Sequence, residues 1–177
     1  MPTRFRPFTS VAAAVLAAVV AGGLAVTGCG GGGSHSYKAG TPAATGNVPD
    51  CSVVSLDVVT RSLGIPLTGP TGGPRPTGGY TCNYNHVKGG GSAPEIIELD
   101  ANVTPQTFAI VRNGLKAANN PIKTIHGWGD EAWAATVYNV VNENSFAVRK
   151  GKVSVLIQST ADYDHIKKLM KAVLAKL

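Results

Sequence analysis

Charged and aromatic residues are scarce in this chain of 177 residues, at 15% and 6% of the sequence. No segment repeats at the spacing of solenoid proteins, which excludes a repeat architecture. The motifs G-x-S-x-G, G-x-x-x-x-G-K-[ST], H-x-x-x-H, H-x-E and C-x-x-C are all missing. The sequence therefore offers no local signature of a serine hydrolase, a phosphate-binding loop, or a metal or redox centre.

An apolar run near the N-terminus, residues 11–21, follows the positive charges of Arg4 and Arg6. Two glycines end the run, so it is shorter than the ~20 residues that a permanent transmembrane helix requires. This pattern is typical of a secretory signal peptide, and we predict that residues 1–28 are removed on export.

The end of this segment, V-T-G-C at residues 26–29, resembles the bacterial lipobox: an aliphatic residue and two small residues before a cysteine. The resemblance implies that Cys29 receives a diacylglycerol and becomes the new N-terminus. Four glycines follow Cys29, and residues 29–49 have the composition of a flexible tether. We therefore predict a protein anchored by lipid to the outer face of the cytoplasmic membrane, with the membrane as its partner through Cys29.

Without residues 1–28 the chain carries 14 basic and 10 acidic residues, a formal net charge of +4. This weak basic excess favours anionic lipid headgroups or wall polymers through long-range attraction. It is not the concentrated basic surface that nucleic-acid binding needs, and export argues against nucleic acid as well. We expect no nucleic-acid partner.

Two cysteines remain, Cys51 and Cys82. In an oxidising, exported compartment such a pair most simply forms a disulfide, and closing a loop of roughly 31 residues stabilises a fold by about 3–4 kcal/mol. The alternative, a redox or metal pair, lacks the C-x-x-C spacing and a second pair of ligands nearby. We predict a structural disulfide and no metal site.

Residues 50–177 have the patterns of a single α+β domain. Ser55 is placed to cap a helix over residues 56–63, and a second helix is expected from Thr104 to about residue 119. The second helix is expected to bury Phe108, Val111, Leu115 and Ala118. The clearest element is an amphipathic C-terminal helix, whose apolar stripe comprises Ile166, Leu169, Met170, Val173, Leu174 and Leu177.

Alternating apolar residues predict several strands between these helices. The expected strands are residues 80–84, 95–103, 122–125, 131–140, 146–149 and 152–158. Residues 66–79, rich in Pro and Gly, are predicted to be irregular, and N-E-N-S at residues 142–145 is predicted to be a turn. We therefore expect an antiparallel sheet of about five to six strands with helices packed on one face.

Polar residues offer few candidates for catalysis. Asp130 and Glu131 are adjacent acids, but at the start of a strand their side chains point to opposite faces, which favours a turn-and-edge role. The four histidines are dispersed along the chain. A hydrolase would need His126 or His86 brought beside Asp130 or Asp100 by the fold.

Aromatic residues supply the candidate binding surface. Trp128 and Trp133 flank the acidic turn, and Tyr80, Tyr84 and Tyr138 are expected nearby in the sheet. Aromatic side chains line ligand grooves because they offer large contact areas with a polar tip. The alternative is that they belong to the core or to its rim.

Four segments carry a wider resemblance. They are CSVVSLDVVTRSLG at residues 51–64, CNY at 82–84, GWGDEAWA at 127–134 and FAVRKGKVSVLIQ at 146–158, ahead of the C-terminal helix. In these the chain resembles small actinobacterial surface lipoproteins whose extracytoplasmic domain is of unknown function. The resemblance implies a Cys51–Cys82 disulfide and an envelope location, and it carries over no catalytic residue.

The sequence thus predicts a non-enzymatic envelope protein without a cofactor. Its folded part is expected to bind a small molecule, a wall polymer or another surface protein. A structural spacer without a ligand and, third, an envelope hydrolase are the alternatives. A binding protein should show a groove near Trp128, Trp133 and the sheet face that helices leave uncovered.

Overall fold

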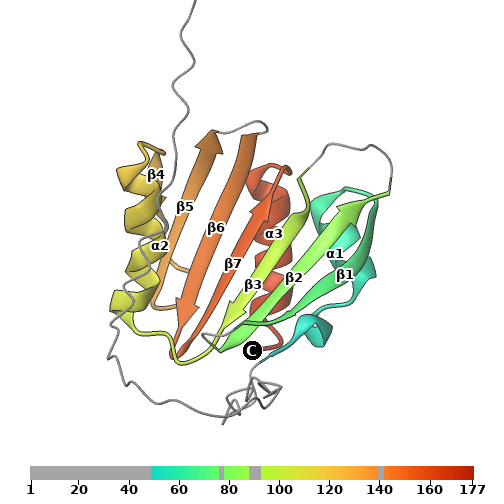
Figure 1. The fold of residues 1–177 in the computed structure, drawn as a ribbon, viewed down its shortest axis with the longest axis horizontal. Coiled ribbons are helices and arrows are strands. Elements are labelled where there is room, and N and C mark those ends of the chain that lie inside the picture. Colours follow the sequence, from blue (N-terminus) through green and yellow to red (C-terminus); the bar gives the residue numbers. More distant parts are fainter. Residues whose placement is uncertain (1–48, 76–77, 88–92, 139–141) are drawn as a thin grey trace, which may run out of the picture. The chain divides into compact units, whose positions relative to one another are not determined.

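The computed structural model describes residues 49–75, 78–87, 93–138 and 142–177. Within these ranges the chain forms one sheet of seven strands and three α-helices, which confirms the α+β class (Figure 1). The predicted signal peptide, Cys29 and the predicted tether up to residue 48 lie outside the described residues. The strands are β1 (Leu67–Pro74), β2 (Gly79–His86), β3 (Glu95–Asp100), β4 (Ile122–Thr124), β5 (Glu131–Tyr138), β6 (Asn142–Lys150) and β7 (Val153–Ser159).

The strands follow the order β1-β2-β3-β7-β6-β5-β4, and every neighbouring pair is antiparallel. Two meanders, β1 to β3 and β4 to β7, therefore join through the pairing of β3 with β7. Strands β1 and β4 form the two edges, so β3 and β7 lie near the centre of the sheet. The second helix, α2 (Pro105–Ala117), connects the two meanders.

The prediction of five to six strands is wrong because the Pro- and Gly-rich segment before β2 forms the edge strand β1. At an edge, proline's missing N–H costs no ladder hydrogen bond, so Pro74 is tolerated there. The register shifts between Thr68 and Thr71, which is a bulge typical of such edges. A Cβ atom at Gly72 would collide with the carbonyl oxygen of Thr81, so this close pairing requires glycine.

The turn predicted at residues 142–145 is also wrong, since these residues begin β6. Polar side chains are accommodated there by hydrogen bonds between neighbouring segments. Thr136 Oγ1 donates to Asn144 Oδ1 at 3.0 Å, and Asn144 Nδ2 donates to the carbonyl of Ala161 at 2.9 Å. These bonds satisfy the amide that makes asparagine a common turn residue.

Helices α1 (Leu56–Leu63) and α3 (Tyr163–Leu174) pack on one face of the sheet, close to their predicted positions. The Ser55 side chain caps α1, and Gly64 ends it in a left-handed conformation. Four residues of the predicted α3 stripe are buried, whereas Leu177 is 38% exposed. The buried four are Ile166, Leu169, Met170 and Val173.

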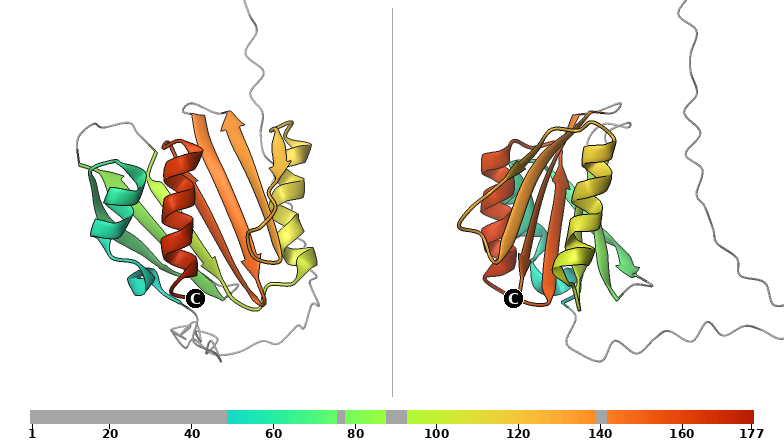
Figure 2. Two further views of the ribbon diagram at one scale, coloured as in Figure 1. Left: turned by 180° about the vertical axis from the view of Figure 1, so that it is seen from behind. Right: turned by 90° about the vertical axis from the view of Figure 1, so that its left-hand side faces the viewer.

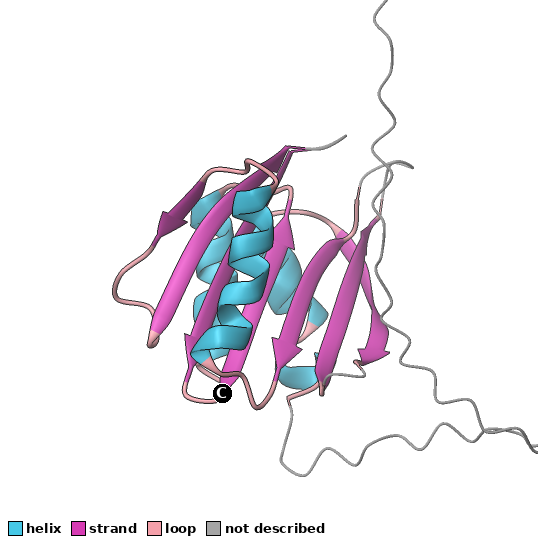
Figure 3. Ribbon diagram, turned by 60° about the vertical axis from the view of Figure 1, so that its left-hand side comes forward, coloured by secondary structure: helices cyan, strands magenta, loops and turns pink. Residues whose placement is uncertain are grey.

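Helix α2 lies on the opposite face of the sheet, so the prediction that the helices share one face is wrong (Figures 2 and 3). Strand residues alternate between the faces: Ala134 belongs to the α1 and α3 core, whereas Trp133 packs with Phe108 of α2. Phe108 is the one buried residue of α2. Burial of Val111 and Ala118 is predicted from the sequence, but both are exposed, Val111 by 46%, because α2 lies over the β4 and β5 edge of the sheet (Figure 1).

The predicted disulfide between Cys51 and Cys82 is present, with the two Cα atoms 5.6 Å apart. It ties a short 3-10 helix (Cys51–Val53) to β2, and the Asp50 side chain accepts from the backbone N–H of Ser52 at 2.8 Å. The start of the described domain is therefore fixed to the sheet. No helix in the described ranges is both long and apolar enough to cross a membrane.

Candidate functional site

The five aromatic residues proposed as a binding surface do not lie together. Tyr84 is fully buried in the α1 and α3 core, where Tyr80 and Trp128 pack partly buried. Trp133 is buried on the other face, under α2, and Tyr138 is 64% exposed near the end of β5. Neighbouring strand positions and the two-sided helix packing separate these residues, so only Trp133 belongs to the face that α2 partly covers.

A groove runs between α2 and this partly covered sheet face; we call it the α2 groove. Its volume is about 350 Å³, and its lining is mostly apolar. The helix contributes Phe108, Ile110 and Val111, and the sheet contributes Trp133, Ala147 and Leu156. The groove thus lies where a groove next to Trp133 was expected, although Trp128 takes no part in it.

The floor of the α2 groove carries an unused hydrogen-bond donor. The Trp133 side chain is 1% exposed, and its buried indole N–H has no partner among the described residues. Phe108 lies over it, with ring centroids 6.2 Å apart at an interplanar angle of 47°. Helix α2 is held on this face through few buried groups, since Phe108 is its one buried residue. One of its few polar ties is the 2.6 Å ion pair between Arg112 and Glu131.

One end of the α2 groove is polar. Arg75 Nη1 lies 3.0 Å from Glu98 Oε2 and 3.0 Å from Asp100 Oδ1, so one guanidinium bridges two carboxylates. Burial raises the pKa of Asp100, while the charge of Arg75 acts in the opposite direction. The three ionised side chains together carry a net charge of −1, which disfavours an anionic group at this end.

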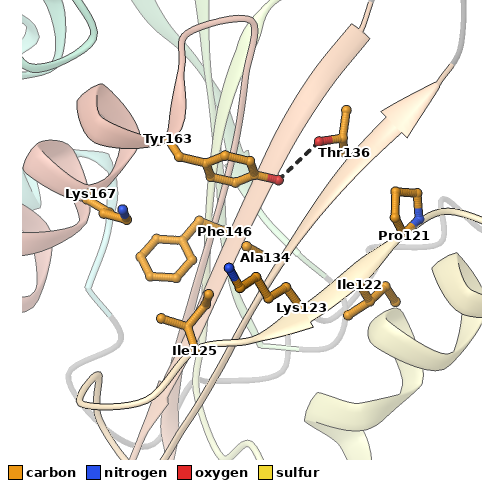
Figure 4. A pocket seen from close by; sticks show the side chains of 9 residues that line it. All are labelled: Pro121, Ile122, Lys123, Ile125, Ala134, Thr136, Phe146, Tyr163 and Lys167. Carbon is orange, nitrogen blue, oxygen red and sulfur yellow. Dashed lines mark hydrogen bonds between the residues drawn. The ribbon is translucent and has the colours of Figure 1, made fainter.

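A second hollow, the α3 pocket, lies on the opposite face beside α3 and has a volume of about 310 Å³ (Figure 4). Its residues come from β4, β5, β6, α3 and the segment that flanks β4. The apolar ones are Pro121, Ile122, Ile125, Ala134 and Phe146; the polar ones are Lys123, Thr136, Tyr163 and Lys167. These residues are far apart in the sequence and are brought together by the sheet.

Among the described residues, neither His86 nor His126 forms a hydrogen bond or ion pair with Asp100 or Asp130, the acids named for a hydrolase. His86 Nε2 lies 2.8 Å from Glu95 Oε1, and Glu95, 1% exposed, also accepts from the N–H and hydroxyl of Thr160. Asp100 is bound to Arg75. Within the described ranges, no group of three or more His, Cys, Asp or Glu side chains could hold a metal ion.

The side chains of Asp130 and Glu131, at the start of β5, point in different directions, as predicted, and contact different elements. Asp130 accepts from the N–H of Gly151 at 2.7 Å and from Arg149 at 3.1 Å, so it fastens the corner between β6 and β7. Glu131 reaches the other way, to Arg112 of α2. Both carboxylates are engaged in structural contacts.

Comparison of the chain with protein-family models, with curated proteins and with solved structures finds no match. Function is therefore inferred from the sequence patterns and from the geometry of the described residues. Sequence reasoning missed Ile110, Lys123 and Lys167. The sequence could have indicated Ile110, because this residue lies outside the predicted apolar stripe of α2 and so marks a second apolar side of the helix. No sequence pattern indicated Lys123 and Lys167, since only the fold brings these two residues together.

Proposed function

We propose that this protein is a cell-envelope lipoprotein whose folded part binds an apolar ligand in the α2 groove without transforming it. Acyl chains on Cys29 would hold it at the outer face of the cytoplasmic membrane. The observation that carries the binding function is the α2 groove itself, which exposed apolar side chains of α2 line together with a buried tryptophan whose N–H has no partner among the described residues.

The exposed part of α2 supports this function. Ile110 and Val111 are 66% and 46% exposed, next to each other, and both line the groove. A contiguous apolar surface in a hollow of ligand size is typical of a binding site, since ligand pockets span ~300–1,000 Å³. Covering these side chains would remove apolar area from water and so favour an apolar partner.

The polar groups of the groove restrict the ligand. The Trp133 N–H would donate to a carbonyl, ether or hydroxyl oxygen of the ligand once α2 moves aside. The net negative charge of the Arg75, Glu98 and Asp100 cluster favours an uncharged or cationic end. We therefore propose a ligand with an apolar body and an uncharged or cationic polar group.

Titration calorimetry with monodecanoylglycerol, an alkyl chain with an uncharged headgroup, tests the groove. Val111→Glu is expected to weaken binding by roughly tenfold or more, because the new carboxylate would lose water to an apolar ligand. Val87→Glu is the matched control: Val87 is 53% exposed and lies outside the groove, so binding should not change. Absence of binding, or equal binding by both variants, would contradict the proposal.

The anchor has its own test. The intact mass of protein extracted from membranes should correspond to a chain that begins at Cys29 and carries acyl groups. Cys29→Ala should abolish this species. A mature chain without added acyl mass, or cleavage at another residue, would refute lipid anchoring while leaving the groove measurement unaffected.

A further inference from the structure

The α3 pocket lies on the opposite face of the sheet from the α2 groove, and the proposed function does not use it. Its floor is apolar and firmly packed, since Phe146 is 1% exposed and Ala134 is 8% exposed. Ile125, half-buried, widens this floor toward β4, whereas Ile122 packs against the cluster under α2. A short hydrocarbon or ring lying here would exclude water from side chains that already have protein behind them.

Two ammonium groups stand around this apolar floor. Lys123 extends from β4 toward Tyr163 and Phe146, and Lys167 approaches from α3 on the other side (Figure 4). Lys167 lies 3.3 Å from Asp164, but that carboxylate is 85% exposed, so the pair is weak and can be exchanged for a ligand. Among the described residues that line the pocket, none is acidic. The pocket therefore has a positive rim.

A chain of hydrogen bonds orients the hydroxyl groups at the pocket wall. The Asn144 amide donates to the carbonyl of Ala161, so its oxygen accepts the proton of Thr136. Thr136 has then used its proton, and the Tyr163 hydroxyl, 3.3 Å away, donates to it. Burial raises the pKa of Tyr163 above its usual 10.0, which keeps this hydroxyl protonated. The donors left for a ligand are therefore those of the two lysines.

From this arrangement we infer that the α3 pocket binds a small amphiphilic anion, with its acidic headgroup between Lys123 and Lys167 and its short apolar body on Phe146 and Ala134. The volume of about 310 Å³ is near the lower limit for ligand sites and matches a small molecule. A cation is disfavoured by both lysines. The two faces of the sheet thus select opposite headgroups: an acid beside α3, and an uncharged or cationic group beside α2.

Titration calorimetry with decanoate tests this inference, with inorganic phosphate as the anion that lacks an apolar body. Decanoate is expected to bind, more weakly at high ionic strength, and phosphate at the same concentration should not displace it. Binding of phosphate in place of decanoate would show a site for free anions and would overturn the amphiphile assignment. Absence of decanoate binding would overturn the inference as a whole.

Paired lysine variants locate the headgroup. Lys123→Gln with Lys167→Gln should weaken decanoate binding roughly tenfold, since two half-exposed ion pairs are lost. The control, Lys168→Gln with Lys176→Gln, removes the same charge from exposed positions that do not line the pocket, and it should leave affinity within about twofold. Equal losses in the two double variants would mean that net charge, and not the pocket, attracts the ligand, which would overturn the inference.

Tryptophan fluorescence locates the apolar body. Trp128 packs edge-on against Phe146, with ring centroids 5.1 Å apart, whereas Trp133 lies on the other face. Brominated decanoate should quench the wild-type protein, and Trp128→Phe should remove most of that quenching. Quenching that persists in Trp128→Phe would place the chain beside Trp133, in the α2 groove, and would contradict the inference. Because monodecanoylglycerol tests the groove separately, failure of one site does not imply failure of the other.

Discussion

The rings of Phe108 and Trp133 lie with their centroids 6.2 Å apart, and Phe108 is the one buried residue that α2 places on the sheet. Phe108 is 6% exposed and Trp133 is 1% exposed, whereas the next apolar residues of α2 face solvent. The helix that forms one wall of the groove is therefore held largely by one aromatic pair. This small cluster is separate from the larger core on the other face of the sheet.

Truncation of the aromatic contact should be costly. Phe108→Ala is expected to lower the free energy of unfolding by about 3 kcal/mol, because a buried ring is replaced by a cavity. Ile110→Ala, at a side chain 66% exposed, should change it by no more than about 0.5 kcal/mol. Urea denaturation measures both. Equal changes in the free energy of unfolding for the two variants would show that the packing of α2 on the sheet does not depend on Phe108.

Helix α2 should open more readily than α3. Helix α3 buries four apolar side chains and α2 buries one, so local unfolding of α2 exposes less apolar surface. Native-state hydrogen exchange should therefore give faster exchange for amides in the middle of α2 than for those in the middle of α3. Equal protection would mean that α2 is a fixed wall, and the Trp133 N–H would then stay out of a ligand's reach.

The disulfide should contribute a large share of the domain's stability. Cys51→Ser with Cys82→Ser is expected to lower the free energy of unfolding by about 3–4 kcal/mol, since it frees a loop that the bridge closes. Reduction of this disulfide in the wild-type protein should likewise lower the urea concentration at the midpoint of unfolding. An unchanged midpoint under reducing conditions would contradict a structural role for the bridge.

Protonation of the Asp162 carboxyl at acidic pH should lower the stability of the fold. Hydrogen bonds with the backbone and the side chain of His165 are the main reason that the pKa of this exposed carboxyl lies below its usual 3.8. A lowered folded-state pKa stabilises the fold above the unfolded value, and this contribution is lost as the pH falls through the folded-state value. Asp162→Asn keeps a capping side chain but cannot titrate. The difference in melting temperature between wild type and variant should therefore shrink below about pH 4; a constant difference would exclude this linkage.

Local patterns were sufficient to predict the helices. The apolar stripe of α3 and the Ser55 cap of α1 both act within one or two turns of helix, where residue spacing and side-chain chemistry decide the local structure. The disulfide was predicted from the expected export of the chain, since a cysteine pair in an exported protein most simply forms a disulfide. These features required no knowledge of the neighbouring segments.

The edge strand and the position of α2 could not be predicted in this way. Pro74 becomes acceptable in β1 only because this strand lies at an edge, and edges are defined by the whole sheet. The alternation along β5 predicts that Trp133 and Ala134 face opposite sides, but it does not tell which side α2 will cover. The α2 groove and the α3 pocket therefore emerge only from the tertiary arrangement.

The most direct test of the account is quenching of Trp133 by a ligand in the α2 groove. Trp128→Phe leaves Trp133 as the only tryptophan, and brominated monodecanoylglycerol quenches an indole only at close range. We expect saturable quenching in Trp128→Phe, which is lost when Val111→Glu is added and kept when Val87→Glu is added. Absence of quenching, or quenching unaffected by Val111→Glu, would contradict a binding function for the groove.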